Sequence, residues 1–247
     1  MDNIWMWFSL FLVGVIFFLW RRIRWLHMDM ERVERAKSNL NDELVRLEYL
    51  QLSQQIQPHF LFNGFNLLLS LARLDRKEEL LNALENLSLF LRSGYTTRPA
   101  QVEIGRELEM TDYYLAIQQM RFGKRLTLQI HCSEKCKKRK TIPYLLQTFV
   151  ENAFKHGLEK RVGPVELEIT FEELTDQTRL IVRDNGTGEK TATDKSGGAG
   201  LQNLRRRLNL LFGAAAGIEL DRTGDYTSAI AWWPTEGTLK NGKKWEI

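Results

Sequence analysis

The N-terminal segment constrains the fold most, because the 17 residues from Ile4 to Trp20 are almost entirely apolar and carry no charge. As an α-helix this run extends about 25 Å, close to the ~30 Å hydrocarbon core of a bilayer. Three arginines follow directly, as is typical of the cytoplasmic end of a membrane helix. Residues 1–25 are therefore predicted to be a single-pass anchor in the cell membrane, with the remainder cytoplasmic. A buried or amphipathic helix is the alternative.

Residues 26–57 carry a heptad pattern. Apolar residues recur at alternating steps of four and three, with Lys37 and Gln51 as polar breaks: Leu26, Met30, Val33, Leu40, Leu44 and Leu47. Such a seam, in a segment rich in Glu and Arg, predicts a parallel coiled coil and hence a homodimer. An ordinary surface helix is the alternative.

Residues 58–98 are predicted to form a helical hairpin. Pro58 removes a backbone donor and is expected to kink the helix just before His59. The strongly apolar continuation predicts a helix that packs inside a bundle. A second helix is predicted over Lys77–Arg92, with Ser93-Gly94 marking its end. Two such hairpins, one from each chain, form a four-helix dimer core.

Residues 99–235 alternate between helical and strand patterns, which predicts an α+β sandwich, and residues 236–247 read as a polar tail. The predicted helices are Glu103–Met120, Pro143–His156, with proline at its first position, and Gly200–Phe212. The predicted strands, mostly antiparallel, are Leu126–Cys132, Val165–Phe171, Thr178–Val182, Ile218–Asp221 and Ser228–Trp232.

Composition argues against several functional classes. The net charge of +4 is too small for a dedicated nucleic-acid binder, so no nucleic-acid partner is predicted. The basic run Lys135–Lys140 is interpreted as a solvated loop. Cys132 and Cys136 lack the further ligands that a structural zinc site needs, and they are predicted to be free thiols.

The segment Glu151–His156 offers groups that suit a metal–phosphate site. Residues one helical turn apart share a face, so Asn152 aligns with His156 and Glu151 with Lys155. An Asn amide oxygen suits magnesium, whereas Lys155 neutralises phosphate charge and Glu151 orients the attacking nucleophile. His156 is expected to contact the nucleotide. The alternative is a surface helix with an ordinary ion pair.

Two glycine-containing segments follow. Asp184 comes directly after a strand, where a carboxylate can accept a hydrogen bond from an adenine amino group, and Gly186 and Gly188 let the backbone approach the base. Taken alone, this segment is also a turn signal. The second segment opens a helix whose N-terminus favours phosphate oxygens, and a hinge is its alternative. Its residues are Gly198, Gly200 and Leu201.

Together with Pro58-His59-Phe60-Leu61-Phe62-Asn63, these motifs resemble the LytS/YesM-type sensor histidine kinases over about Leu50–Pro234. The catalytic half of that family has the Bergerat (GHKL) ATPase fold. The resemblance implies that His59 is phosphorylated, that Asn152 binds magnesium and that Asp184 binds adenine. It assigns the phosphate side of the pocket to Gly198, Gly200 and Leu201. It also covers Gln118–Gly123, in which Arg121 has no assigned role.

The chain departs from the family pattern in three places. Phe60 follows the histidine where many histidine kinases have an acidic residue, so the base that activates His59 must come from elsewhere, and Glu151 is the candidate. Gly64-Phe65 replaces a more usual Thr or Ser and Leu, which loosens the helix. The short stretch between Gly188 and Gly197 predicts a small nucleotide lid.

The resemblance implies an ATP- and Mg²⁺-dependent protein histidine kinase of a two-component system, which passes the phosphoryl group from His59 to an aspartate of a response regulator. Only Met1–Asn3 precede the apolar run, so sensing is expected within the bilayer or through a partner membrane protein. A non-catalytic ATP-binding membrane scaffold and a GHKL ATPase that never phosphorylates itself are the alternatives.

Overall fold

The computed structural model describes residues 20–22, 24, 25, 28, 30, 58–95, 101–187 and 198–235. They belong to two compact units, 1–51 and 52–247. The described residues of the first unit are helical and exposed, and the Arg24 guanidinium lies 4.9 Å from the centre of the Trp20 ring. In these described ranges, no helix is both long and apolar enough to cross a bilayer.

Several predictions fall on other residues. The apolar run before Trp20, most of the predicted coiled coil 26–57, Gly188 and the tail 236–247 lie outside the described residues. The anchor and the coiled coil therefore stay predictions.

The second unit begins with the predicted helical hairpin, α2 (Pro58–Arg73) and α3 (Lys77–Tyr95). Both helices turn apolar side chains inward, and these are buried: Phe60, Leu68, Leu71, Ala83, Leu87 and Phe90. The sequence offers Ser93-Gly94 and Arg98-Pro99 as signals for the end of this helix, and α3 continues through the first of them to end at Tyr95. A single glycine costs a helix only about 1 kcal/mol, which is too little to end one that packs against a neighbour.

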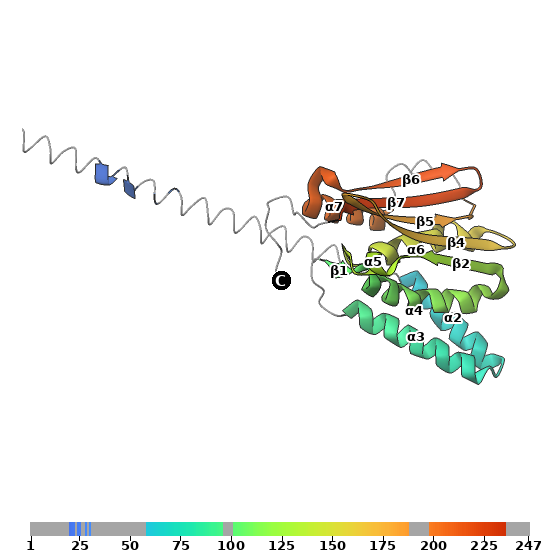
Figure 1. Cartoon of the computed structure of the whole chain (residues 1–247). Helices are drawn as coiled ribbons and strands as arrows, with labels where there is room; N and C mark the ends of the chain where they lie inside the picture. Colours follow the sequence, from blue (N-terminus) through green and yellow to red (C-terminus); the bar gives the residue numbers. More distant parts are fainter. Residues whose placement is uncertain are drawn as a thin grey trace, which may run out of the picture. The chain divides into compact units, whose positions relative to one another are not determined.

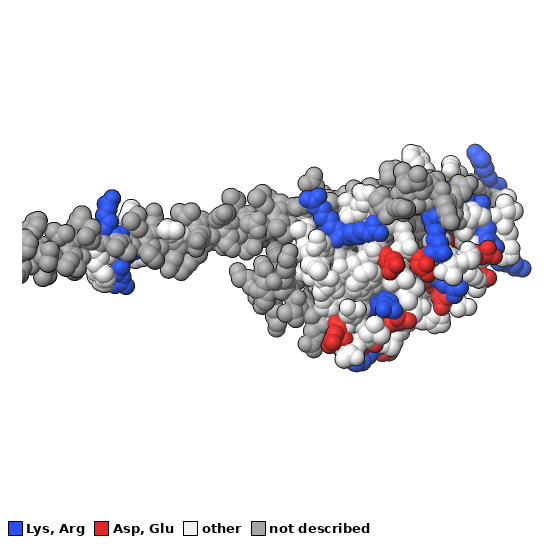
Figure 2. Space-filling model, turned by 90° about the horizontal axis from the view of Figure 1, so that it is seen from above, with Lys and Arg blue, Asp and Glu red and all other residues white. Residues whose placement is uncertain are grey.

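A five-stranded sheet forms the opposite layer, in the order β2 (Leu126–His131), β4 (Val165–Glu173), β5 (Gln177–Asp184), β7 (Tyr226–Pro234), β6 (Gly217–Thr223). Only the β2–β4 pair is parallel among these strands. Burial alternates along β4 and β5, so one face is covered and the other carries charged side chains. On the surface drawn in Figure 2, acidic and basic groups lie close together.

Helices α6 (Leu145–His156) and α7 (Ala199–Phe212) lie against the covered face of the sheet and each other, and α4 (Ile104–Phe122) packs between α6 and the hairpin (Figure 1). Short 3₁₀ turns follow three of them, at Gly123–Arg125, Leu158–Lys160 and Gly213–Ala215. The hairpin, the helical layer and the sheet thus stack in that order. The mixed α+β class is as predicted.

The start of α6 differs from the prediction. Tyr144 adopts a left-handed backbone conformation with φ 67°, and its N–H donates to Glu107 Oε1 at 2.8 Å. The Pro143 carbonyl accepts from Arg207 Nη2 at 2.8 Å. Because α4 and α7 hold these two residues outside the helix, α6 begins at Leu145 and Pro143 is not its first residue.

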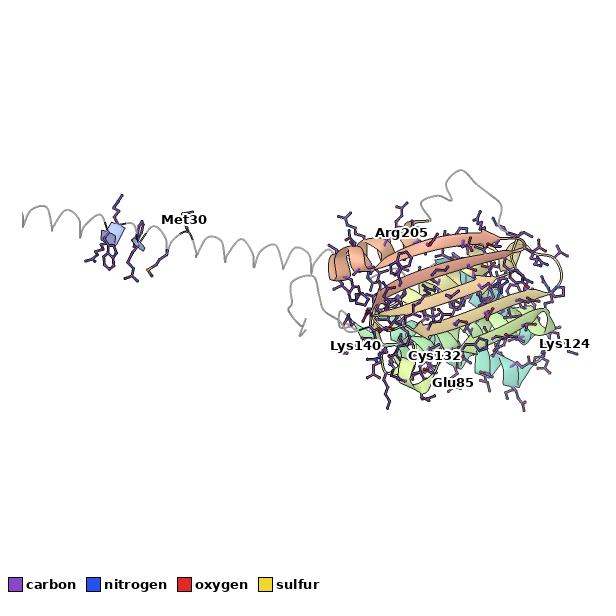
Figure 3. The ribbon with its side chains drawn as sticks, turned by 45° about the horizontal axis from the view of Figure 1, so that its top comes forward. Met30, Glu85, Lys124, Cys132, Lys140 and Arg205 are labelled. Carbon is purple, nitrogen blue, oxygen red and sulfur yellow. The ribbon has the colours of Figure 1, made fainter. Side chains whose placement is uncertain are left out.

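The basic run after β2 is also more ordered than a solvated loop. The run includes most of the short helix α5 (Glu134–Lys137) and ends in strand β3 (Lys140–Thr141). Strand β3 pairs antiparallel with β1 (Val102–Glu103). Lys135 Nζ lies 3.0 Å from Glu173 Oε1, which also pairs with Arg139. Cys132, labelled in Figure 3, and the buried Cys136 are both free thiols, as predicted.

Candidate functional site

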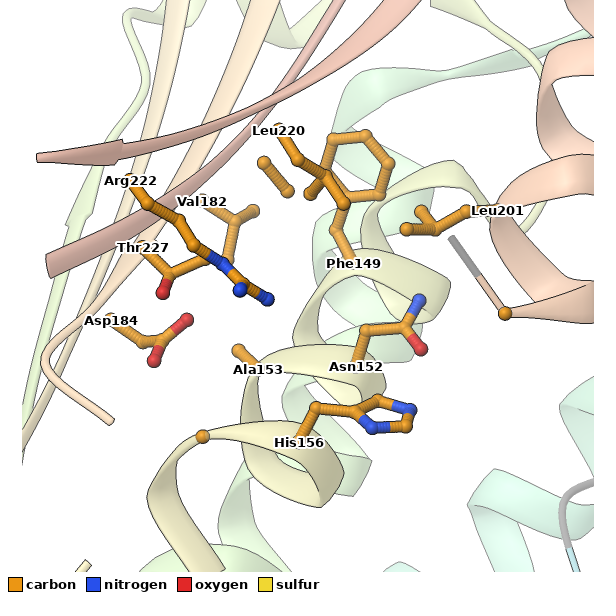
Figure 4. A pocket seen from close by; sticks show the side chains of 13 residues that line it. Phe149, Asn152, Ala153, His156, Val182, Asp184, Leu201, Leu220, Arg222 and Thr227 are labelled. Atoms are coloured by element: carbon orange, nitrogen blue, oxygen red, sulfur yellow. The ribbon is translucent and has the colours of Figure 1, made fainter. Parts of the chain in front are cut away.

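A pocket opens between α6, the N-terminus of α7 and strands β5, β6 and β7 (Figure 4). The space within it amounts to about 630 Å³, which includes open solvent.

Strand register builds the sheet side of the pocket. Residues directly opposite each other on neighbouring strands point to the same face, so cross-strand partners form rows. An apolar row runs across β5, β7 and β6 as Val182, Ala229 and Leu220. The next row, towards the pocket mouth, is polar and consists of Asp184, Thr227 and Arg222. The pocket therefore has an apolar floor with a charged edge.

One face of α6 forms the opposite wall, through Phe149, Asn152, Ala153 and His156. These positions follow helical spacing, and the predicted alignment of Asn152 with His156 is confirmed. The Asn152 amide nitrogen is buried and has no hydrogen-bond partner. A buried polar atom without a partner is uncommon in a folded protein, and here it faces a pocket that a polar ligand can enter.

Asp184 lies at the edge of the floor and is only 5% exposed. Its Oδ1 accepts a hydrogen bond from the Gly186 N–H at 2.9 Å. Burial raises the pKa of the Asp184 carboxyl to about 6, although the Gly186 N–H and the charge of Arg222 act in the opposite direction. The carboxylate is thus held in place by one backbone donor and retains acceptor capacity for a ligand.

Two glycines make room for this carboxylate. A Cβ on Gly157 would meet Asp184 Oδ1 and the Ala153 carbonyl, and a Cβ on Gly186 would meet the Gly157 backbone. Neither position admits a side chain without movement of its surroundings. Gly186 therefore supports Asp184, and among the two glycines only Gly157 lines the pocket.

Glu151 and Lys155 do not line the pocket. Glu151 is buried and accepts from Gln147 Nε2 at 2.8 Å, and burial raises its pKa to about 7. Burial and, next, the charge of Glu151 raise the pKa of Tyr114 on α4. Glu151 therefore acts on the α4 side of α6, while Lys155 is exposed.

The N-terminus of α7 lies at the end of the pocket that the sequence predicts to bind phosphate. Gly198 and the buried Leu201 line the pocket, whereas Gly200 lies against Thr148, whose Cγ2 would be 3.2 Å from an added Cβ. Gly188 lies outside the described residues.

The hairpin is linked to the far side of α6 through the ring of Tyr114, which lies on α4. The Phe60 ring centre lies 4.6 Å from that of Phe90 and 4.5 Å from that of Tyr114, and Tyr114 lies 5.8 Å from Phe154 of α6. His59, the residue before Phe60, is the second residue of α2. The hairpin motif and the pocket helix are thus joined through α4.

A polar network lies beside these rings. Asn63 Nδ2 donates to Glu159 Oε1 at 3.3 Å, and Arg121 Nη1 lies 3.0 Å from the same oxygen. Arg121 also donates to Gln118 Oε1 at 2.7 Å, and Gln118 donates to the Tyr114 hydroxyl at 2.7 Å. Arg121, which had no predicted role, therefore links the end of α4 to the Glu159 turn, and Glu159 contacts the hairpin.

Sequence reasoning missed part of the pocket. The glycine directly after Glu151–His156 was a detectable signal, because the chain turns there beside Asp184. The polar row members Thr227 and Arg222 carry no local motif, and only strand pairing brings them to Asp184. The remaining missed lining residues are apolar: Phe149, Ala153, Val182, Leu220 and Ala229.

Comparison with known proteins gives one family and two informative relatives. Residues 47–126 match the family described as histidine kinase. The chain is 32% identical over 205 residues to the sensor protein LytS of Staphylococcus haemolyticus, covering 78% of this chain and 35% of that protein. It is 29% identical over 211 residues to the sensor histidine kinase/phosphatase LytS of Staphylococcus aureus, covering 80% and 36%. The chain thus spans about a third of the length of these relatives.

Among solved structures, the histidine kinase domain of the Erythrobacter litoralis EL346 blue-light activated histidine kinase matches 81% of this chain and 98% of its own, at 16% identity and a TM-score of 0.45.

Proposed function

We propose that this chain, a member of the LytS-type histidine kinases, is the kinase of a two-component system. It binds ATP in the α6–sheet pocket, phosphorylates His59 and passes the phosphoryl group to an aspartate of a response regulator. One observation carries the proposal: α6 lines a pocket with an apolar floor and a charged edge on one face and is joined on its other face, through Tyr114, to the hairpin that bears His59.

The pocket suits a purine nucleotide. The apolar row of Val182, Ala229 and Leu220 provides a surface for a base, and the buried Asp184 carboxylate provides an acceptor for its amino group. At the other end, Gly198 exposes the first N–H groups of α7, and a helix N-terminus favours phosphate oxygens.

Magnesium fits the same end. Asn152 lines the pocket with a buried amide nitrogen that has no hydrogen-bond partner, and the oxygen of the same amide is a suitable ligand for a hard cation. Within the described ranges, no group of three or more His, Cys, Asp or Glu side chains forms a metal cluster. Magnesium bound with nucleotide commonly takes one or two protein ligands together with phosphates and water, and it neutralises phosphate charge.

In the proposed reaction, the Nε2 lone pair of His59 attacks the γ-phosphorus. An N–P bond forms while the bond between the γ-phosphorus and the bridging oxygen of ADP breaks. Glu151, whose pKa burial raises to about 7, is the candidate proton acceptor for the imidazole. In the second step an aspartate oxygen of the regulator attacks the phosphorus and the N–P bond breaks.

A second copy of the chain is the proposed occupant of the outer face of the hairpin. Phe62, Phe65 and Leu69 of α2, with Leu81 and Leu84 of α3, are exposed, and Phe62 is 69% exposed. Exposed apolar side chains at helical spacing on both helices favour an interface, and two hairpins make a four-helix core. Residues 1–25 anchor the dimer in the membrane in this proposal, with the kinase in the cytoplasm and a partner membrane protein supplying the stimulus.

The test incubates the full chain, in detergent or nanodiscs, with γ-labelled ATP and magnesium. Acid-labile, alkali-stable label is expected on the parent and on His131→Gln, an exposed histidine of β2, and none on His59→Gln. Nucleotide binding without label would instead support an ATP-binding scaffold. Turnover that is unchanged in His59→Gln would support an ATPase.

A further inference from the structure

Arg222 is the one member of the polar row that carries a positive charge. It lies on β6 directly opposite Thr227 of β7, and Thr227 lies directly opposite Asp184 of β5. All three line the pocket, and Figure 4 shows the Arg222 side chain extending over Thr227 towards Asp184. Neighbouring strands are about 4.8 Å apart, so two strand spacings are within the reach of an arginine side chain.

Few other charges face Asp184. Among the described residues around it, α6 contributes the titratable His156, and the directly opposed residues of β7 and β4 are the uncharged Thr227 and Leu167. The Gly186 N–H supplies a neutral donor. Arg222 of β6 is therefore the permanent cation that acts on this carboxylate, and its charge opposes the effect of burial on the pKa of Asp184.

We propose that Arg222 is a positioning residue of the nucleotide pocket, which keeps the Asp184 carboxylate charged and ready to accept the amino group of a purine. Arg222 is exposed at the pocket mouth, so it can approach Asp184 without closing the entrance to the base. Asn152, the candidate magnesium ligand, lies on α6 across the pocket from this row (Figure 4). This inference rests on the proposed binding of ATP.

The physical reason is the cost of a buried charge. A carboxylate with few polar neighbours takes up a proton, and a protonated carboxyl is a weaker acceptor for an amino group. An arginine remains charged at every pH of interest, so it offsets this cost whether or not a nucleotide is bound. A histidine or a neutral donor in the same place would not.

The experiment measures the affinity of the full chain for ADP and magnesium between pH 5.5 and 8.5, by calorimetry. In the parent, affinity falls as the pH drops through the value near 6 at which Asp184 gains its proton. In Arg222→Met the midpoint of this fall moves up by no more than about one pH unit, because Arg222 is exposed and solvent screens part of its charge. Affinity at pH 6.5 then drops by up to about threefold and recovers towards pH 8.5.

Two controls isolate the charge. Arg222→Lys keeps the parent midpoint. Arg183→Met removes an equal charge from the residue next to Asp184, but Arg183 lies on the other face of the sheet, over the Tyr226 ring, and the midpoint stays in place. The titration of the ligand's own phosphate is common to all variants and cancels in the comparison.

An equal loss of affinity at every pH in Arg222→Met, or an unchanged midpoint, overturns this inference and leaves ATP binding intact. Failure of the parent itself to bind ADP at any pH overturns the proposed function, and the inference with it.

Discussion

The two faces of α6 differ in whether their side chains already have contacts within the chain. The pocket face presents an amide nitrogen without a hydrogen-bond partner at Asn152 and an open apolar floor beyond it. The opposite face is filled by Phe154, Tyr114 and Phe60, and Glu151 is buried there with a hydrogen bond from Gln147. A single helix thus separates a surface open to a ligand from a surface already packed against its own chain.

The largest effect on stability is expected from truncating Phe60, which is buried between the hairpin and α4. Phe60 is 3% exposed and contacts two aromatic rings, so Phe60→Ala should lower the free energy of unfolding by about 3–5 kcal/mol. Urea denaturation measures this loss. Leu174→Ala, at a 43% exposed turn position, serves as the control and should change little. Equal losses in both variants would mean that the hairpin does not pack on α4 in solution.

The second largest effect is expected from the buried carboxyl of Glu151, on the same face of α6. Because burial raises the pKa of Glu151 to about 7, the folded state binds this proton more tightly than the unfolded state does. The stabilisation is complete below pH 4.5 and is lost as the pH rises to about 7. Glu151→Gln should therefore be more stable than the parent at pH 8, by about 2–3 kcal/mol relative to the same comparison at pH 5.

Urea denaturation at the two pH values measures this difference. Glu172→Gln, a half-exposed acid of β4, is the control and should follow the parent. If the stability of the parent depended on pH in the same way as that of Glu151→Gln, folding would not raise the pKa of Glu151, and the two faces of α6 would not differ in this respect.

On the pocket face, Asn152→Ala should separate binding from folding. Stability should be nearly unchanged, because the amide nitrogen has no partner to lose. Magnesium-dependent binding of ADP should fall by roughly 10–100-fold, which is about 1.4–2.7 kcal/mol. Calorimetry measures the binding, with Asn209→Ala, an exposed asparagine of α7, as the control. A large loss of stability would contradict the view of this face as one left open for a ligand.

The smallest effect is expected from the polar network beside the rings. Arg121 and Glu159 are 22% and 19% exposed, so Arg121→Met should cost about 1 kcal/mol or somewhat more. Arg76→Met, which breaks the more exposed pair with Glu79, should cost less than about 0.5 kcal/mol. Equal losses in urea denaturation would show that this network does not stabilise the packing of the hairpin.

Much of this arrangement could be predicted from local patterns. The predicted helices and strands of residues 58–235 match observed elements, and helical spacing alone separated Asn152 and His156 from Glu151 and Lys155. Local patterns could not predict the Asp184–Thr227–Arg222 row, because strand register depends on pairing between distant segments. They also missed the start of α6, which is set by Glu107 and Arg207 from two other helices.

Because α6 lines the pocket on one face and packs against α4 on the other, few of its residues can be substituted without effect. Seven of its twelve residues are buried, and neighbouring positions serve different partners, so most substitutions there disturb either the ligand or the hairpin. Exposed residues of β6 such as Glu219 and Asp221 have no place in the pocket lining. Substitutions between related proteins should therefore accumulate at such positions, with α6 and the Asp184–Thr227–Arg222 row left nearly invariant.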